Sequence, residues 1–301
     1  GDLHRLRARV HRAIDRALEP DAAGLVRALA TGDRGAMSED ATEAVRDAGL
    51  AHLTAVSGFH LGVVAWLWVT GLGALFRRWR AVAEGFGADR LAAVLGLPVV
   101  IVYPLFVGGN PSAVRAGIMF AMVLLARVAR RGREAWSALA AALMAMVAWD
   151  PACLGGPGFQ LSFAAVAALL RIPPAVERGL GLSPQTWPGP ARFAWTAAMA
   201  SVAATLGTAP FVALHFGRLS VIGLLTNIPA GLIAAVAVPF ALGGGLVAAV
   251  APDLGEPLLA VAGAAAEALL TLARVSADLP GAVWTLPPPK PLELLLFFAT
   301  M

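Results

Sequence analysis

Long apolar blocks constrain this chain more than any other feature of its sequence. They run for about 17 to 25 residues, the length that crosses a bilayer as an α-helix. Only 14% of the residues are charged, against roughly 25% in average soluble domains. The sequence therefore predicts an all-α fold, that of a polytopic helical membrane protein. Strands of a membrane β-barrel would instead appear as segments of about 10 alternating residues.

We expect about eight or nine spans, some of them broken or re-entrant. The predicted stretches are 51–76, 91–107, 112–129, 135–149, 153–170, 193–214, 219–251 and 257–274, and a last apolar segment begins at Pro291. Prolines and glycines interrupt 219–251, which predicts one kinked span plus a re-entrant piece, or two short spans. Pro98 and Pro104 should bend the second span.

Residues 1–50 are too polar to span and are expected to form helices. In 1–20, apolar residues recur at helical spacing against a set of arginines. These are Arg5, Arg7, Arg9, Arg12 and Arg16. Such a helix either lies flat on a membrane surface or packs on its own protein. We expect an amphipathic external segment over 1–50 and a transmembrane channel domain over 51–301, truncated at its C-terminus.

Arginines gather in three of the predicted loops. They are Arg77, Arg78, Arg80 and Arg90 in 77–90, Arg127, Arg130, Arg131 and Arg133 in 127–134, and Arg171, Arg178 and Arg192 in 171–192. Basic loops favour the cytoplasmic side of a membrane. Residues 1–50 and the turns near 110, 155 and 216 are then expected on the external side.

This topology places the polar groups of the spans at one depth, facing outward. They are His52, Ser57, His60, Asn110, Ser112, Arg115, Gln160, Ser162, His215, Arg218 and Ser220. Gly58, Phe159 and Asn227 complete the residues predicted to line the path. Polar groups inside a span are costly unless they are used. An outward-open vestibule or channel mouth is the simplest explanation.

Ser57 and His60 share a helix face because they are three residues apart. They could form a nucleophile–base pair, line a pore, or hold two helices together. Gly58 allows close helix approach or local unwinding. Ser112 is expected to cap the third span, where Arg115 would complete an anion or phosphate site. The alternative for Arg115 is a side chain that snorkels to the headgroups.

The remaining polar positions also leave alternatives open. Phe159 and Phe163 could pack together or stack on the bases of a single strand. Gln160 needs a partner at its depth, so it is expected to be interhelical or pore-facing. Asn227, followed by Pro229, fits a broken helix that lines a cavity.

Several motifs in order resemble the membrane channel module of the ComEC family of bacterial competence proteins. They are Gly32-Asp33-Arg34, residues 49–60 (GLAHLTAVSGFH), residues 109–116 (GNPSAVRA), residues 158–163 (GFQLSF), Pro210 with residues 215–220 (HFGRLS), and Asn227-Ile228-Pro229. They cover roughly residues 25–240. One mild departure is that Phe59 precedes His60, where the family usually has a bulky aliphatic pair after its Ser-Gly.

The resemblance implies a channel that conducts single-stranded DNA across the bacterial cytoplasmic membrane during natural transformation. It implies single-stranded DNA and membrane lipids as partners, together with external DNA-binding and nuclease domains of a longer protein. An external DNA receptor and a cytoplasmic ATPase are implied as well. The nuclease domain's HxHxDH-type motif does not occur in this sequence, so neither enzyme activity nor a metal or cofactor is expected.

Two other functions compete with the channel. One is an intramembrane serine hydrolase that uses Ser57 with His60 or His215, although an i,i+3 pair rarely aims a base at its nucleophile. The other is a carrier of small anions or lipids that uses the same external vestibule.

Overall fold

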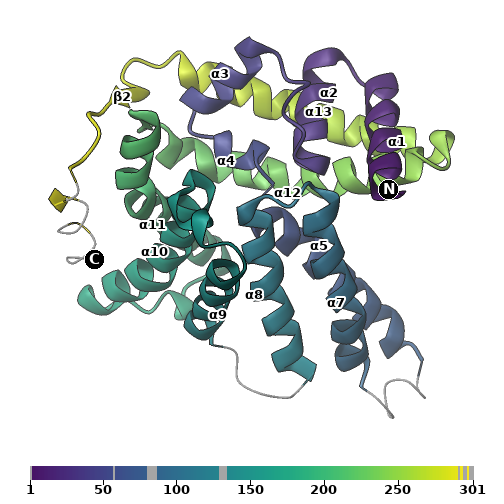
Figure 1. Ribbon diagram of the computed structural model, residues 1–301, viewed down its shortest axis with the longest axis horizontal. Helices are drawn as coiled ribbons and strands as arrows, with labels where there is room; N and C mark the ends of the chain where they lie inside the picture. Colours follow the sequence, from purple (N-terminus) through teal and green to yellow (C-terminus); the bar gives the residue numbers. More distant parts are fainter. Residues whose placement is uncertain are drawn as a thin grey trace. The chain divides into compact units, whose positions relative to one another are not determined.

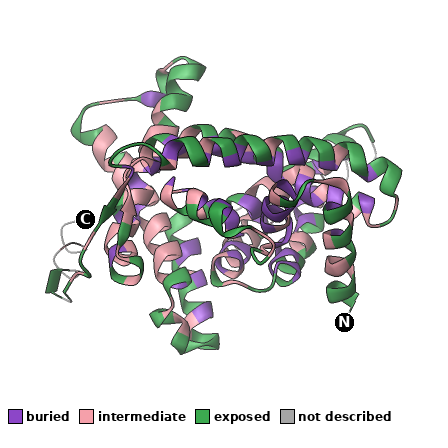
Figure 2. Cartoon of the chain, turned by 90° about the horizontal axis from the view of Figure 1, so that it is seen from above, coloured by how far each residue is buried: buried purple, intermediate pink, exposed green. Residues whose placement is uncertain are grey.

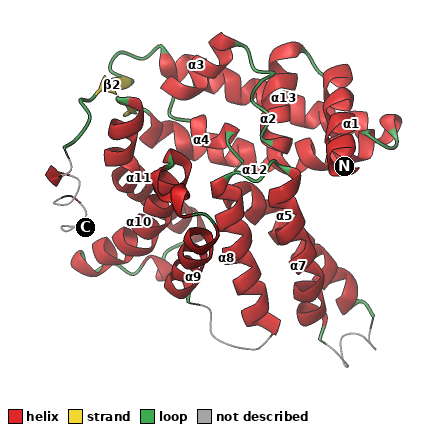
Figure 3. Ribbon diagram, in the orientation of Figure 1, coloured by secondary structure: helices red, strands yellow, loops and turns green. Residues whose placement is uncertain are grey.

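The computed structural model describes residues 2–56, 58–79, 87–128, 134–290, 292–293 and 297. Nearly all of the regular structure in these ranges is helical (Figure 3). The α-helices are α1 (Asp2–Ala17), α2 (Pro20–Thr31), α3 (Glu39–Asp47), α4 (Ala51–Thr54), α5 (Gly58–Arg77), α7 (Ala88–Phe106), α8 (Pro111–Val128), α9 (Ala135–Trp149), α10 (Pro157–Gly179), α11 (Gly189–Phe216), α12 (Gly223–Ala248) and α13 (Pro252–Ala277). Two short 3-10 helices, η1 (Pro151–Gly155) and η2 (Pro184–Thr186), and two strands, β1 (Arg218–Ser220) and β2 (Val283–Thr285), complete the order.

Within the described ranges, seven helices are long and apolar enough to cross a membrane, namely α5, α7, α8, α10, α11, α12 and α13. Helix α9 is also apolar but has only 15 residues. Large apolar side chains such as Trp66, Leu105 and Met144 are exposed on these helices, and Figure 2 shows how widely exposed residues cover the chain. Extended apolar surface of this kind fits contact with lipid. The protein is therefore a polytopic helical membrane protein, as predicted.

The predicted boundaries need two corrections. The first span begins at Gly58 rather than at residue 51, because the chain leaves the short helix α4 after Thr54 and starts α5 at Gly58. The stretch 219–251 is not broken or re-entrant, since it forms the single 26-residue helix α12. Pro229 and Pro239 are accommodated within it, because in a membrane helix neighbouring groups can satisfy the backbone carbonyls that a proline leaves unpaired. Arg80, Arg130, Arg131 and Arg133 and the segment from Pro291 lie outside or almost wholly outside the described residues.

The chain folds as two compact units. The first comprises Gly1–Ser38, His52–Trp149 and Ala234–Ala268, and the second comprises Glu39–Ala51, Asp150–Ile233 and Leu269–Met301. In the first unit α5, α7 and α8 pack against one another (Figure 1). A Cβ added to Gly96 of α7 would lie 2.9 Å from Val69 Cγ2 and 3.2 Å from Leu124 Cδ1. Gly96 therefore lets the three helices approach closely, as small residues do in membrane bundles.

The N-terminal helix α1 packs on its own protein. Val10 and Ile14 have no exposed surface. A Cβ added to Gly245 of α12 would lie 2.8 Å from Val10 Cγ1, and one added to Gly263 of α13 would meet Leu18. This is the second of the two alternatives for the amphipathic segment, because the apolar face of α1 is already covered by protein.

The second unit is built on the antiparallel hairpin of α10 and α11. A Cβ added to Gly207 of α11 would lie 3.0 Å from the Ala164 carbonyl oxygen, so the hairpin is closely packed at this point. Trp195 Nε1 donates to Glu177 Oε1 at 3.1 Å near the loop that joins the two helices. Strands β1 and β2 form an antiparallel ribbon in which Leu219 faces Trp284. The ribbon was not predicted, since strands of three residues carry too short a pattern to be recognised.

Candidate functional site

Two buried polar side chains lie near the first turns of α5 and α8. His60, the third residue of α5, has no exposed surface, and Arg115, the fifth residue of α8, is 6% exposed. A Cβ added to Gly58 would lie 3.5 Å from Arg115 Nη2 and 3.6 Å from Ala116 Cβ. The starts of the two helices therefore lie together, and the guanidinium of Arg115 lies against the first residue of α5.

The Arg115 guanidinium is buried among helices. Its Nη1 donates to Met119 Sδ at 3.4 Å, one turn further along the same helix. A snorkelling arginine would extend its charged head to the water-exposed interface, whereas this side chain keeps its head within the helix packing. The geometry thus argues against the snorkelling alternative.

Asn110, not Ser112, caps α8. The helix begins at Pro111, and Asn110 Oδ1 accepts a hydrogen bond from the Ala113 backbone N–H at 2.8 Å. Proline is favoured at the first helical position, where its missing N–H costs nothing, and asparagine is a preferred residue just before it. The prediction that Ser112 caps the span is therefore wrong. The Ala113 N–H is already satisfied and is not offered to an external anion.

The helical structure is interrupted between Thr54 and Gly58, which agrees with local unwinding, one of the two alternatives for Gly58. His52 lies on α4, ahead of the span, and is exposed. Ser57 lies outside the described residues. The three alternatives for Ser57 and His60 therefore stay predictions.

In the second unit, Gln160 and His215 join α10 to α11. Gln160 Nε2 donates to the Leu154 carbonyl oxygen at 2.9 Å, which leaves its Oε1 2.7 Å from His215 Nε2. The amide orientation means that the His215 ring donates this bond. Phe159 is 4% exposed, and its ring centroid lies 4.4 Å from that of Phe163. This contact fits the packing alternative for the two aromatics, and Ser162 lies half-buried on the same helix.

The end of α3 is held by the β1–α12 segment, also within the second unit. Arg218 Nη2 lies 3.3 Å from Asp47 Oδ2. The Ser220 hydroxyl donates to the Asp47 carbonyl and the Thr226 hydroxyl to the Ala48 carbonyl, both at 2.7 Å. These bonds satisfy carbonyls at a helix C-terminus, which have no partner within the helix. Arg218 thus serves an ion pair in this structure, where its side chain is 41% exposed.

Asn227 lies inside the continuous helix α12, so the expected broken helix at this position is wrong. Its Nδ2 donates to Ser201 Oγ of α11 at 3.3 Å, and Ser201 donates in turn to the Leu224 carbonyl at 3.1 Å. Asn227 Oδ1 is buried and has no hydrogen-bond partner among the described residues. This side chain acts as an interhelical contact between α11 and α12.

The predicted polar positions thus form two groups. Within the first unit, Gly58, His60 and Arg115 lie near the paired starts of α5 and α8, with Asn110 and Ser112 at the start of α8. Within the second, Gln160 and His215 are bonded to each other, and Arg218 and Asn227 bond to other partners.

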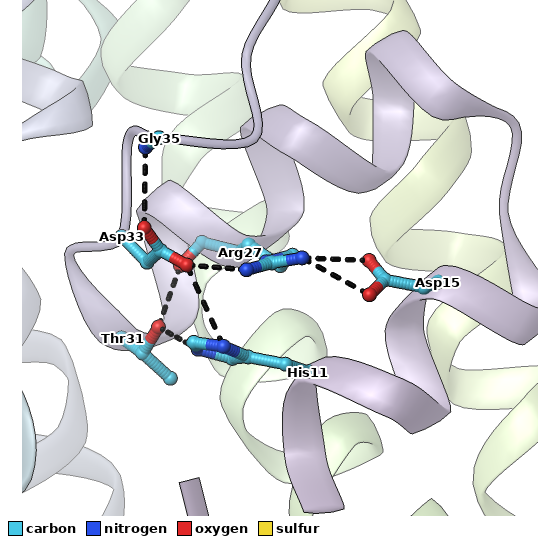
Figure 4. A network of polar contacts seen from close by, with 6 residues as sticks. All are labelled: His11, Asp15, Arg27, Thr31, Asp33 and Gly35. Carbon is cyan, nitrogen blue, oxygen red and sulfur yellow. Dashed lines mark hydrogen bonds and ion pairs between the residues drawn. The ribbon is translucent and has the colours of Figure 1, made fainter. Parts of the chain in front are cut away.

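One polar network was not predicted, although it includes Asp33 of the Gly32-Asp33-Arg34 motif (Figure 4). Arg27 of α2 donates to Asp33 Oδ2 and binds Asp15 of α1 through Nη1, at 3.0 Å to Oδ2. His11 Nε2 lies 2.7 Å from Thr31 Oγ1, and its Nδ1 lies 3.5 Å from Asp33 Oδ2. The signal that could have revealed this network is an acid placed directly after an apolar helix that carries a single arginine.

The network shifts the protonation of its members. Burial alone would raise the pKa of the Asp33 carboxyl, but the hydrogen bonds from Arg27 and from the Gly35 N–H outweigh it, so the pKa lies below its ordinary value. Burial and the Arg27 charge lower the pKa of His11 below its ordinary value of 6.5, despite the nearby Asp33 and Asp15. Asp33 is therefore held ionised beside a neutral His11 at neutral pH.

The motif also fixes α2 against the spans. Gly32 has a φ of 74° and ends α2, and its N–H donates to the Ala28 carbonyl. A Cβ added to Gly32 would lie 3.2 Å from Val56 Cγ2 and 3.4 Å from the Val107 carbonyl oxygen. The network therefore lies at the end of the first unit where α5 begins and α7 ends.

Comparison with known proteins identifies relatives of this chain. It is 28% identical over 213 residues to ComE operon protein 3 of Bacillus subtilis (strain 168), which covers 70% of this chain and 24% of that relative. It is 36% identical over 153 residues to competence protein ComA of Neisseria gonorrhoeae, covering 50% and 21%. It is 28% identical over 145 residues to the uncharacterized protein YcaI of Escherichia coli (strain K12), covering 47% and 18%.

These matches span at most about a quarter of the length of each relative. No solved structure matches the chain. A family model described as Competence protein matches residues 29–301, which include the Gly32-Asp33-Arg34 motif and every described membrane span. The chain therefore belongs to the Competence protein family.

Proposed function

We propose that this chain is a channel that conducts single-stranded DNA across the bacterial cytoplasmic membrane during natural transformation. Membership of the Competence protein family implicates the chain in natural transformation, and the seven long apolar helices of its described residues suit a membrane channel. DNA as the cargo, the cytoplasmic membrane as the location and the external position of residues 1–50 belong to the proposal.

The observation that carries the proposal is the position of Arg115. A guanidinium that is permanently charged is 6% exposed inside a membrane-span helix, against Gly58 at the start of another. Ionisable groups within spans are expensive and mark substrate or ion pathways. A backbone phosphate is the partner that an arginine binds best, through paired charge-assisted hydrogen bonds.

The charge distribution of the first unit supports passage of the strand from the external side to the cytoplasmic side. Buried polar groups lie where α5 and α8 begin, whereas Arg77, at the last turn of α5, binds Asp89 Oδ1 at 2.7 Å near the start of α7. Basic residues at this second end fit the cytoplasmic side. The buried arginine then lies near the external side, where a strand would enter.

In the proposed channel the path for the strand is lined, within the first unit, by Gly58, His60, Asn110, Ser112 and Arg115. The external DNA-binding and nuclease domains, an external DNA receptor and a cytoplasmic ATPase would deliver the strand and drive its passage.

The test is Arg115→Ala in cells that express the longer protein. We expect the entry of labelled DNA into the nuclease-protected interior to fall at least tenfold, while DNA bound at the cell surface stays unchanged. Arg127→Ala is the matched control, because Arg127 is an exposed arginine near the other end of the same helix. Normal entry in Arg115→Ala at normal membrane abundance would contradict the role assigned to Arg115.

Neither alternative function is favoured by an observation. For the hydrolase, His215 Nε2 is already engaged by Gln160 at 2.7 Å, and Ser57 lies outside the described residues. Labelling of Ser57 by a fluorophosphonate probe in the folded protein would support a hydrolase. A small-anion or lipid carrier would show transport of its substrate without any DNA-dependent conductance.

A further inference from the structure

One face of α1 carries an arginine stripe, defined as Arg5, Arg9, Arg12 and Arg16. All four residues are exposed. At 3.6 residues per turn they fall within an arc of about 60°. At 1.5 Å per residue the stripe runs for about 16 Å along the helix axis. It is therefore a straight row of positive charge on one side of a single helix.

The opposite face of α1 is already occupied. Val10 and Ile14 lie about 140° to 180° around the helix from Arg5, and both are fully buried. An amphipathic helix on a membrane inserts its apolar face between the acyl chains. In α1 that face packs on the glycines of α12 and α13, so it is not available to a bilayer, and the stripe faces outward from the protein.

Most of the positive charge of the stripe is uncompensated. Arg5 pairs with Asp2 at 2.7 Å, but the two side chains are 77% and 95% exposed, so the pair is weak. Asp15 is engaged by Arg27. Glu19 follows the helix as an exposed residue. Within the described ranges, no carboxylate forms an ion pair with the other three arginines, Arg9, Arg12 and Arg16.

Helix α1 lies at the same end of the first unit as Arg115, and the contact is made by Arg7, on the face opposite the stripe. A Cβ added to Gly108, in the turn between α7 and α8, would lie 3.3 Å from Arg7 Nη1 of α1. The same turn leads through Asn110 into α8, whose fifth residue is Arg115. Helix α1 therefore lies beside the turn that opens onto the proposed entrance.

We propose that the arginine stripe binds the phosphate backbone of single-stranded DNA ahead of the channel entrance. The proposal rests on the proposed function, since DNA is the partner only of a DNA-conducting chain. A stacked strand carries one charge per about 3.4 Å, so about five phosphates face a row about 16 Å long. Phosphate contacts carry no sequence information, and binding is independent of base sequence.

The test uses the protein in nanodiscs of zwitterionic lipid and a fluorescent oligo(dT), with binding followed by anisotropy over a range of salt concentrations. Each phosphate contact to a single strand contributes about −0.7 to the slope of log K against log salt. Losing three contacts in R9Q/R12Q/R16Q should reduce that slope by about 2. The triple lysine variant, R9K/R12K/R16K, keeps the charges and should keep the slope.

The control removes three other exposed arginines, in R171Q/R178Q/R192Q, and should leave the slope unchanged. An unchanged slope in R9Q/R12Q/R16Q, or an equal loss in the control, would overturn the proposal. Vesicles containing phosphatidylglycerol provide the lipid arm. If the glutamine variant loses vesicle binding but keeps oligo(dT) binding, the stripe is a lipid contact and the proposal is wrong.

Failure of this inference can be told apart from failure of the channel proposal. Oligonucleotide binding in nanodiscs requires no passage through the membrane, and Arg115→Ala removes at most one phosphate contact, so it should change the salt slope by at most about 0.7, against about 2 for R9Q/R12Q/R16Q. A channel without a DNA-binding stripe would show normal slopes in R9Q/R12Q/R16Q and defective entry in Arg115→Ala. A stripe without a channel would show a reduced slope in R9Q/R12Q/R16Q and unchanged entry in Arg115→Ala.

Discussion

Asp33→Ala tests whether the polar network holds α1 and α2 in place. Asp33 accepts hydrogen bonds from Arg27 and from the Gly35 N–H. The side chains of the Arg27–Asp33 pair are only 20% and 24% exposed. Truncation would leave Arg27 with the partly exposed Asp15 as its one ion-pair partner among the described residues.

The magnitude follows from the burial of the pair. A hydrogen bond to a charged group contributes about 1.5 to 3 kcal/mol, and a partner left unsatisfied adds a cost of similar size. Asp15 remains to compensate Arg27, so we expect about 2 kcal/mol of lost local stability. Since each 1.4 kcal/mol is tenfold, the amides of α1 and α2 should exchange about 30-fold faster.

The assay is hydrogen–deuterium exchange by mass spectrometry on the detergent-solubilised protein. Peptides from α1 and α2 should exchange faster in Asp33→Ala, while those of the α10–α11 hairpin should not. Asp2→Ala is the matched control, because it removes an acid from a highly exposed pair on the same helix, where no measurable change is expected. Equal exchange in Asp33→Ala and wild type would refute the assigned role of the network, as would an equal effect of Asp2→Ala.

Two further predictions concern local stability. The pKa of His11 is lowered in the folded protein, so the unfolded chain binds more protons and stability falls as pH drops below 6.5. The hydrogen-exchange rate of amides in α1 and α2, corrected for the intrinsic rate, should rise as pH falls from about 7 to 5.5. His11→Gln should reduce this rise. In Asn110→Ala the loss of the cap of α8 should cost about 1 kcal/mol and lower the midpoint of thermal unfolding. Asn110→Asp keeps the acceptor and should stay close to wild type, and a similar loss in both variants would exclude capping as the cause.

Part of the site could have been located more accurately from local rules. The Asn-Pro-Ser sequence at 110–112 offers two capping residues, and Pro111 decides between them because proline is favoured at the first helical position. An interruption near Gly58 was one of two alternatives for this glycine, the other being close helix packing. The continuity of α12 was not predictable in the same way, since prolines both break helices in water and are tolerated in membrane helices.

The sequence alone determined that the chain crosses a membrane, because only apolar segments of sufficient length can leave water for hydrocarbon. It also determined the family resemblance, which the match over residues 29–301 supports. Tertiary structure decided which polar residues meet. Gly58 lies against Arg115 from 57 positions away, and Gln160 bonds to His215 from 55 positions away. Such pairings depend on which helix faces contact each other, and hydropathy carries no information about them.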